Sequence, residues 1–139
     1  APLVDAWSQM LAGGKRLRAA FAYWSWRAHG GHPATAGATA LVGVGAALEL
    51  FQAAALFHDD VMDRSDTRRG IPTAHRTFAA RHDESGWSGD ADQFGLSSAI
   101  LLGDLSLVAS EDEFLRAVSD MPSSQTDPAR RLFTRCAPR

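Results

Sequence analysis

The sequence has 139 residues, of which 45% are hydrophobic and 22% are charged, a balance typical of a globular domain with a substantial core. The formal net charge of −2 excludes a general attraction to nucleic acid or to anionic membranes, so any anion-binding site must be local. A lone cysteine, Cys136, excludes an internal disulfide, and the start of the sequence has no signal-peptide pattern, so we expect a cytoplasmic protein.

Two helices are predicted in the first half of the chain. Apolar residues spaced four, three and four apart predict a helix over 17–28, which Gly30 and Pro33 end. A second helix, capped by Thr35, is predicted to run to about Asp63. It is apolar on nearly all sides, as expected for a helix that other helices surround.

Within the second predicted helix, residues 39–57 have nearly the length that spans a bilayer. Glu49 and Gln52 lie near the middle of this segment, where an acidic group costs about 2.5 kcal/mol or more in a membrane. We therefore expect a buried helix and no transmembrane segment.

The second half of the sequence is also predicted to be helical. Residues 64–72 are polar and predict a loop, and Asp90 can cap a helix over the apolar run that follows it. Ser110 and Glu113 have the spacing of a capping box, which predicts the start of a further short helix. Asp127 followed by Pro128 predicts the start of the last helix. No alternation of apolar and polar residues predicts a strand, so the fold class is all-α.

The segment FHDDVMDRSDTRRG, residues 57–70, gathers aspartates directly after the apolar helix. On a helix, Asp59 and Asp63 are i, i+4 neighbours whose carboxylates emerge on one face about 5–6 Å apart and repel one another. Mg²⁺ prefers such oxygens and completes its coordination with water and substrate phosphates. A solvated acidic helix end with no bound ion is the alternative, and the spacing alone leaves both interpretations open.

Two basic stretches supply candidate anion sites. Arg68 and Arg69 follow the acids, and one guanidinium group can bind two phosphate oxygens at once. The segment GGKRLR, residues 13–18, places Lys15 and Arg18 on one face at the start of a helix, where anions are favoured. Each stretch alone is typical of surface charge, whereas both together with a metal site suit a pair of diphosphate substrates.

Three motifs in this order, GGKRLR, HDDVMD followed by RRGIPTAH, and GDLSL, resemble the N-terminal half of the trans-isoprenyl diphosphate synthases, the polyprenyl synthetases. The resemblance covers residues 13–107, and it is specific because terpene cyclases share only the Asp-rich motif. It implies one domain over residues 1–139 with an antiparallel helix bundle of the isoprenoid synthase type. The bundle would be truncated, because nothing after Asp66 has the spacing of the family's second Asp-rich motif.

The resemblance also implies roles at the allylic substrate. It implies that Asp59 and Asp63 hold Mg²⁺ against an allylic diphosphate and that Arg68 binds this diphosphate. Asp60, the middle member of the motif, is the weakest candidate for a direct ligand. The implied reaction is ionisation of the allylic diphosphate, followed by attack of the double bond of isopentenyl diphosphate.

The co-substrate, isopentenyl diphosphate, is implied to be held by Lys15, Arg18, Arg69 and Gln52. The resemblance further implies a homodimer formed by helix packing. We expect the chain by itself to be inactive, because half of the family's metal ligands are missing. The alternative is a short non-catalytic homologue that binds diphosphate or docks on a full synthase.

Product length is implied by the residues before the Asp-rich motif, where bulky side chains stop the growing chain in this family. Ala54 and Ala55 are small, and Phe51 lies one turn deeper. One turn is about 5.4 Å, close to one isoprene unit, so a product of about twenty carbons or longer is expected.

Overall fold

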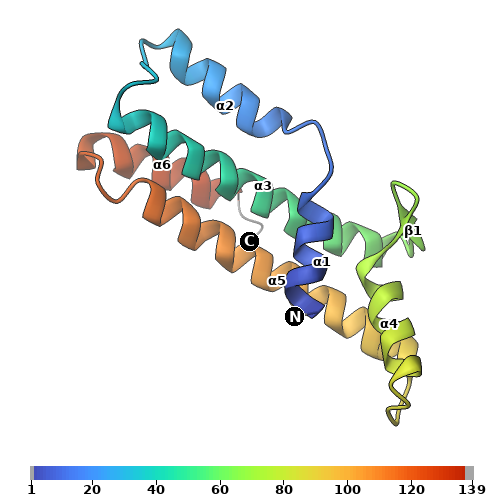
Figure 1. Ribbon diagram of the computed structural model, residues 1–139. Coiled ribbons are helices and arrows are strands. Elements are labelled where there is room, and N and C mark those ends of the chain that lie inside the picture. The colour runs from blue at the N-terminus through green and yellow to red at the C-terminus, as the bar shows by residue number, and fades with distance from the viewer. Residues whose placement is uncertain (1, 137–139) are drawn as a thin grey trace. The chain divides into compact units, whose positions relative to one another are not determined.

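The computed structural model describes residues 2–136 (Figure 1), and Ala1 and residues 137–139 of the predicted domain lie outside this range. The prediction of an all-α fold is confirmed, because the described elements are helices apart from one small hairpin. In chain order they are α1 (Pro2–Leu11), α2 (Leu17–Ala28), α3 (Ala36–Met62), β1 (Thr67–Arg68), β2 (Ile71–Pro72), α4 (Ala74–Glu84), α5 (Ala91–Ala117) and α6 (Ser123–Cys136).

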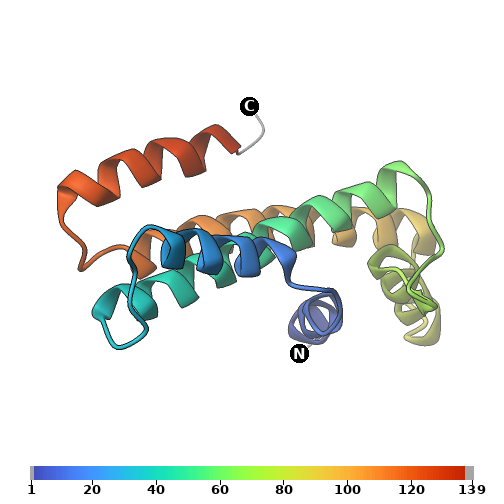
Figure 2. The same cartoon turned by 90° about the horizontal axis from the view of Figure 1, so that it is seen from above.

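The described residues form two compact units, and the division falls inside α3 and inside α5. The first unit comprises residues 2–15 and 50–109, and the second comprises 16–49 and 110–136. Within each unit, α3 and α5 run side by side in opposite directions (Figures 1 and 2). The prediction of a single domain over the whole chain stays a prediction.

The core of the first unit joins α3, α4 and α5. Phe57 on α3 and Leu102 on α5 are each 1% exposed, and Phe78 on α4 packs with them. Along α1, Ala6, Trp7, Met10 and Leu11 pack against this core. The end of α3 that carries the aspartates is therefore fixed by apolar contacts on its inner face.

The second unit depends on a close approach of α3 and α5. A Cβ atom at Gly43 would lie 2.6 Å from the Cβ of Ala117, so only glycine fits there. Ser110 is fully buried, and its hydroxyl donates a hydrogen bond of 2.7 Å to the carbonyl oxygen of Ala47. The small residues of α3 thus admit the neighbouring helix.

Three local predictions of secondary structure are wrong. Ser110 does not begin a short helix, because its hydroxyl binds α3 and α5 continues through it. Pro128 does not open the last helix, since α6 begins at Ser123 and contains this proline. The polar segment 64–72 holds two short strands in place of a loop alone.

The cap of α5 agrees with the sequence. Asp90 Oδ1 accepts a hydrogen bond of 3.0 Å from the backbone N–H of Gln93, and α5 begins at Ala91. Helix α2 has the predicted bounds. Helix α3 begins directly after the predicted cap, Thr35, and ends at Met62, one residue before the predicted end. The helices α1 and α4 were not predicted.

Two helices of the described part, α3 and α5, are long and apolar enough to cross a membrane by length and composition alone. Core helices of soluble proteins meet the same two criteria. In the second unit, Glu49 of α3 forms an ion pair of 3.3 Å with Arg16, so the acid in the middle of α3 has a partner within the protein. Only 28% of the most apolar stretch of α3 is buried within the described structure, so the prediction of a buried helix stays a prediction.

Candidate functional site

The first two aspartates of the HDDVMD motif lie in the last turn of α3. The helix ends at Met62, but the backbone N–H of Asp63 still donates to the carbonyl oxygen of Asp59 over 2.8 Å. The helical turn therefore continues through Asp63 and keeps the predicted i, i+4 relation. The side chain of Asp59 is 47% exposed and Asp63 is also exposed, so both carboxylates are accessible to a ligand.

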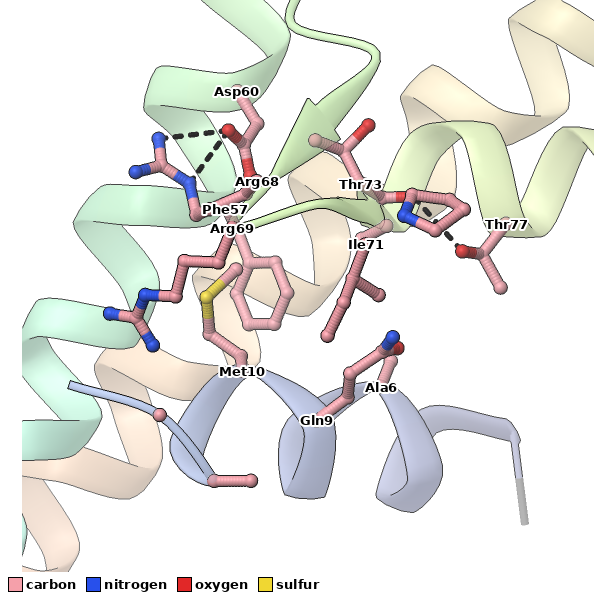
Figure 3. Close-up of a pocket in the computed structure, with 14 residues that line it drawn as sticks. Ala6, Gln9, Met10, Phe57, Asp60, Arg68, Arg69, Ile71, Thr73 and Thr77 are labelled. Atoms are coloured by element: carbon pink, nitrogen blue, oxygen red, sulfur yellow. Dashed lines mark hydrogen bonds and ion pairs between the residues drawn. The ribbon is translucent and has the colours of Figure 1, made fainter.

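Asp60 has a different environment, because it is only 2% exposed. Its Oδ1 accepts a hydrogen bond of 2.8 Å from Nε of Arg68, and Nη2 of the same guanidinium lies 2.7 Å from Oδ2 of Asp59 (Figure 3 shows the contacts of Arg68 with Asp60). Arg68 thus binds two adjacent carboxylates, one buried and one accessible.

The second oxygen of Asp60, Oδ2, has no hydrogen-bond partner among the described residues. Burial raises the pKa of this carboxyl, the bonded and charged Arg68 opposes that rise, and neighbouring Asp59 adds to it. A buried carboxylate with one unpaired oxygen is unfavourable unless a cation stays beside it. Asp60 therefore holds Arg68 in place and is not presented to solvent as a metal ligand.

The RRG sequence forms the tip of the β1–β2 hairpin. Thr67 pairs with Pro72 and Arg68 with Ile71, which leaves Arg69 and Gly70 as the turn. Both have positive φ, 57° and 77°, as a two-residue type I′ turn requires. Arg69 in this region is uncommon for a side chain with a Cβ, so the surroundings must hold it.

The side chain of Arg69 lies against the glycines of the GGKRLR motif. Figure 3 shows this side chain extending near the end of α1. A Cβ atom at Gly13 would overlap Nη1 of Arg69, and one at Gly14 would lie 3.2 Å from Nη2. Gly14 also has a φ of 100°, which favours glycine. Two motifs far apart in the sequence are thus brought together, and Lys15 follows directly.

A cavity of about 200 Å³ lies beside these arginines (Figure 3). Its walls come from α1, the end of α3, the hairpin and the start of α4, and they include Met10, Phe57, Ile71 and Thr77. This cavity cannot be recognised in the sequence, because its lining residues are single positions on separate elements and form no motif.

The remaining residues predicted to bind the co-substrate are Gln52, Lys15 and Arg18. Gln52 is half-buried on α3, seven residues before Asp59, which corresponds to about 10.5 Å along the helix on nearly the same face. Lys15 is exposed in the first unit. Arg18 is exposed at the start of α2, in the second unit, so its position relative to the others is not defined.

The sequence profile of the family described as polyprenyl synthetase matches residues 2–128. The chain belongs to the polyprenyl synthetase family. The predicted resemblance is therefore confirmed at the level of the family.

Individual relatives agree with this assignment. The polyprenyl synthetase chain is 33% identical over 134 residues to a geranylgeranyl diphosphate synthase of Sulfolobus acidocaldarius, covering 96% of this chain and 29% of that protein. It is 45% identical over 64 residues to a short chain isoprenyl diphosphate synthase of Methanothermobacter thermautotrophicus, covering 46% of this chain and 18% of the relative.

A solved structure is also similar to this polyprenyl synthetase chain. It is the crystal structure of geranylgeranyl pyrophosphate synthase from Corynebacterium glutamicum complexed with isoprenyl diphosphate and magnesium, with a TM-score of 0.75 and 40% sequence identity. The match covers 84% of this chain and 34% of that structure. The chain thus spans 18 to 34% of the length of these three proteins.

The donor set of this polyprenyl synthetase fits a hard divalent cation. No group of three or more His, Cys, Asp or Glu side chains suited to a metal occurs among residues 2–136. Mg²⁺ does not need one, because it is commonly held by one or two carboxylates with water and substrate phosphates. Asp59 and Asp63 supply two accessible carboxylates from one turn of helix.

Proposed function

We propose that the complete protein is a prenyltransferase that condenses an allylic diphosphate with isopentenyl diphosphate. One observation carries the proposal. The type I′ turn gives two consecutive arginines different partners: Arg68 binds the aspartates of α3, and Arg69 lies against Gly13 and Gly14. Two neighbouring guanidinium groups with separate surroundings suit two diphosphate substrates. The names of the relatives support the same reaction class.

In this proposal Asp59 and Asp63 hold Mg²⁺, and Arg68 binds the allylic diphosphate. The ion would stabilise the negative charge that develops on the departing diphosphate. Arg68 keeps its bond to buried Asp60, exchanges accessible Asp59 for a diphosphate oxygen, and so remains oriented while its partner changes. The allylic C–O bond breaks with its electron pair on the diphosphate.

The co-substrate would be held by Arg69 and Lys15, where the glycines keep the backbone free of side chains. Gln52 and Arg18 complete the proposed set. Holding isopentenyl diphosphate beside the ionising substrate aligns its double bond with the allylic carbon and removes the entropic cost of their encounter. A new C–C bond forms and a proton is lost, giving a product five carbons longer.

An elongation assay tests this function. The complete gene product is expected to incorporate labelled isopentenyl diphosphate into longer chains with Mg²⁺ and an allylic primer. The 139-residue chain alone is expected to show no turnover, because it lacks a second Asp-rich motif. Absence of elongation by the complete protein contradicts the function, and robust elongation by the isolated chain contradicts the proposal of half a site.

Product length is proposed to depend on the face of α3 that carries Asp59. Phe51, Ala55 and Asp59 are spaced i, i+4, i+8 on this face, and Ala55 is exposed. Ala54 is 3% exposed and packs inside the first unit, so it is a poor candidate for the floor of a product cavity. We therefore propose that Phe51 is the floor and that the product has about twenty carbons or more, one turn of about 5.4 Å beyond Ala55.

Substitutions on this face are expected to change product length. Ala55→Phe is expected to shorten the main product by about one five-carbon unit, and Phe51→Ala is expected to lengthen it, because one helical turn is about 5.4 Å. Ala80→Phe, on the exposed side of α4, is the matched control and is expected to leave the products unchanged. Chromatography of the dephosphorylated products gives the answer, and unchanged lengths in both variants would refute this assignment.

We further propose a cytoplasmic homodimer. The support for dimerisation is an apolar stripe on α5 in the first unit, where Leu101, Leu105 and Val108 are 67%, 42% and 65% exposed. Their spacing of four and three places them on one helical face, which suits packing against another helix. The molar mass of the complete protein in solution tests this proposal.

A further inference from the structure

The GDLSL motif, residues 103–107, lies on α5 and contains none of the charged side chains assigned to substrate. Its first residue, Gly103, is buried and faces the ring of His58 on α3. A Cβ atom at Gly103 would overlap the imidazole atoms of His58. The overlap can be relieved by a turn of the His58 ring or by a movement of α3. Because His58 directly precedes Asp59, a movement of α3 would also move the first proposed metal-binding aspartate.

One hydrogen bond and one ion-pair contact hold the same ring. Nε2 of His58 lies 3.2 Å from the carbonyl oxygen of Ile100 and 3.4 Å from Oδ1 of Asp104, the second residue of the motif. The Ile100 carbonyl oxygen can only accept, so Nε2 carries the proton in this hydrogen bond. Gly103 thus provides the space for the ring, and Asp104 and the Ile100 carbonyl fix its orientation.

The fourth residue of the motif, Ser106, binds α1. It is fully buried, its hydroxyl accepts a hydrogen bond of 2.6 Å from the indole N–H of Trp7, and it donates one of 2.6 Å to the carbonyl oxygen of Leu102. Helix α1 ends at Leu11, two residues before Gly13. The indole bond therefore ties α5 to the helix that leads into the GGKRLR motif.

We propose that GDLSL is a positioning motif that fixes the two binding segments of the first unit on α5. Through His58 it sets the position of the aspartates at the end of α3, and through Trp7 it sets the position of the glycines and Lys15 after α1. Gly103, Asp104, Ser106, His58 and Trp7 are positioning residues, since none is assigned a contact with substrate. The functional part of this inference rests on the proposed prenyltransferase activity.

The contact of the motif with His58 on α3 and its contact with Trp7 on α1 predict different kinetic effects. Gly103→Ala in the complete gene product is expected to lower kcat about 10-fold or more and to raise the Mg²⁺ concentration for half-maximal rate, because small misplacements of catalytic groups reduce rates strongly. The KM for isopentenyl diphosphate is expected to change less than about two-fold. A general loss of folded protein would lower the apparent kcat without changing the Mg²⁺ concentration for half-maximal rate.

Ser106→Ala is expected to give the opposite pattern. Without the acceptor for Trp7, the KM for isopentenyl diphosphate should rise about five-fold, while kcat and the Mg²⁺ requirement stay within about two-fold. Ser97→Ala is the matched control on the same helix, because Ser97 is exposed and, among the described residues, its hydroxyl forms a hydrogen bond only with Gln93. The control is expected to match the wild type.

A double-mutant cycle tests the contact itself. If Gly103 serves to admit the His58 ring, the Gly103→Ala change should lower the thermal unfolding midpoint much more in the wild type than in a His58→Ala background. Equal effects in both backgrounds would overturn the role of the ring. The same cycle still decides the contact if Gly103→Ala is too unstable for kinetics.

The failures of the two proposals are distinguishable. If the wild-type protein does not elongate prenyl chains, the proposed function is wrong, and the thermal cycle still reports on the His58–Gly103 contact. If the wild type elongates but Gly103→Ala and Ser106→Ala alter the same constants in the same proportion, the positioning motif is refuted. We expect the effects of Gly103→Ala and His58→Ala on the unfolding midpoint to be non-additive. We also expect Gly103→Ala to change the Mg²⁺ requirement and Ser106→Ala to change the KM for isopentenyl diphosphate.

Discussion

Asparagine in place of Asp59 or Asp63 is expected to lower kcat for chain elongation by about 100- to 1,000-fold, the range seen when one group that stabilises transition-state charge is removed. Both carboxylates are accessible and belong to one helical turn, so each substitution removes a charged oxygen ligand and leaves the shape almost unchanged. The rate measured against Mg²⁺ concentration should show a higher requirement in each variant.

Asp66→Asn is the matched control for these two variants. Asp66 is 74% exposed and forms an ion pair of 3.3 Å with Arg76, and exposed pairs of this kind contribute little to stability. This variant is expected to keep wild-type rates. If Asp59→Asn or Asp63→Asn kept more than about a tenth of the wild-type kcat with an unchanged Mg²⁺ requirement, the metal assignment would be wrong.

Lysine in place of Arg68 is expected to lower kcat about 100-fold, although the charge is retained. A lysine ammonium cannot match the geometry with which Nε and Nη2 of Arg68 bind Asp60 and Asp59. The substitution also leaves Asp60 buried without its paired donors, so stability is expected to fall by about 3 kcal/mol at most. Steady-state kinetics and denaturant unfolding measure the two effects.

The two effects of Arg68→Lys are separable. Adding Asp60→Asn removes the buried charge and is expected to restore most of the lost stability, but none of the lost activity, because the guanidinium is still absent. Arg81→Lys, an exposed change on α4, controls for the replacement itself. Recovery of activity in the double variant would mean that Arg68 acts only by neutralising Asp60.

Much of the fold follows from spacing in the sequence. The predictions of α2 and α3 succeeded because apolar residues repeat at helical intervals over many turns, and the cap at Asp90 is a local hydrogen bond that the sequence determines. The strands β1 and β2 were missed because two residues each are too few for alternation to appear. Ser110 was misread because a capping pattern does not reveal a partner on another helix.

The site was partly predictable for a related reason. The spacing of Asp59 and Asp63 alone indicates a shared face, so the candidate metal pair is visible in the sequence. The partner of Asp60 is not visible, because it depends on how the hairpin folds back on α3. The packing of Arg69 against Gly13 depends likewise on a tertiary contact between segments 56 residues apart.

The most direct test is a crystal structure of the complete gene product with Mn²⁺, as an anomalous substitute for Mg²⁺, and an allylic thiodiphosphate that ionises slowly. The expected density has metal bound to carboxylates of Asp59 and Asp63, and a diphosphate oxygen on Arg68 in the place of Asp59. Metal bound elsewhere, or a diphosphate that contacts neither Arg68 nor a metal ion on these aspartates, would contradict the account.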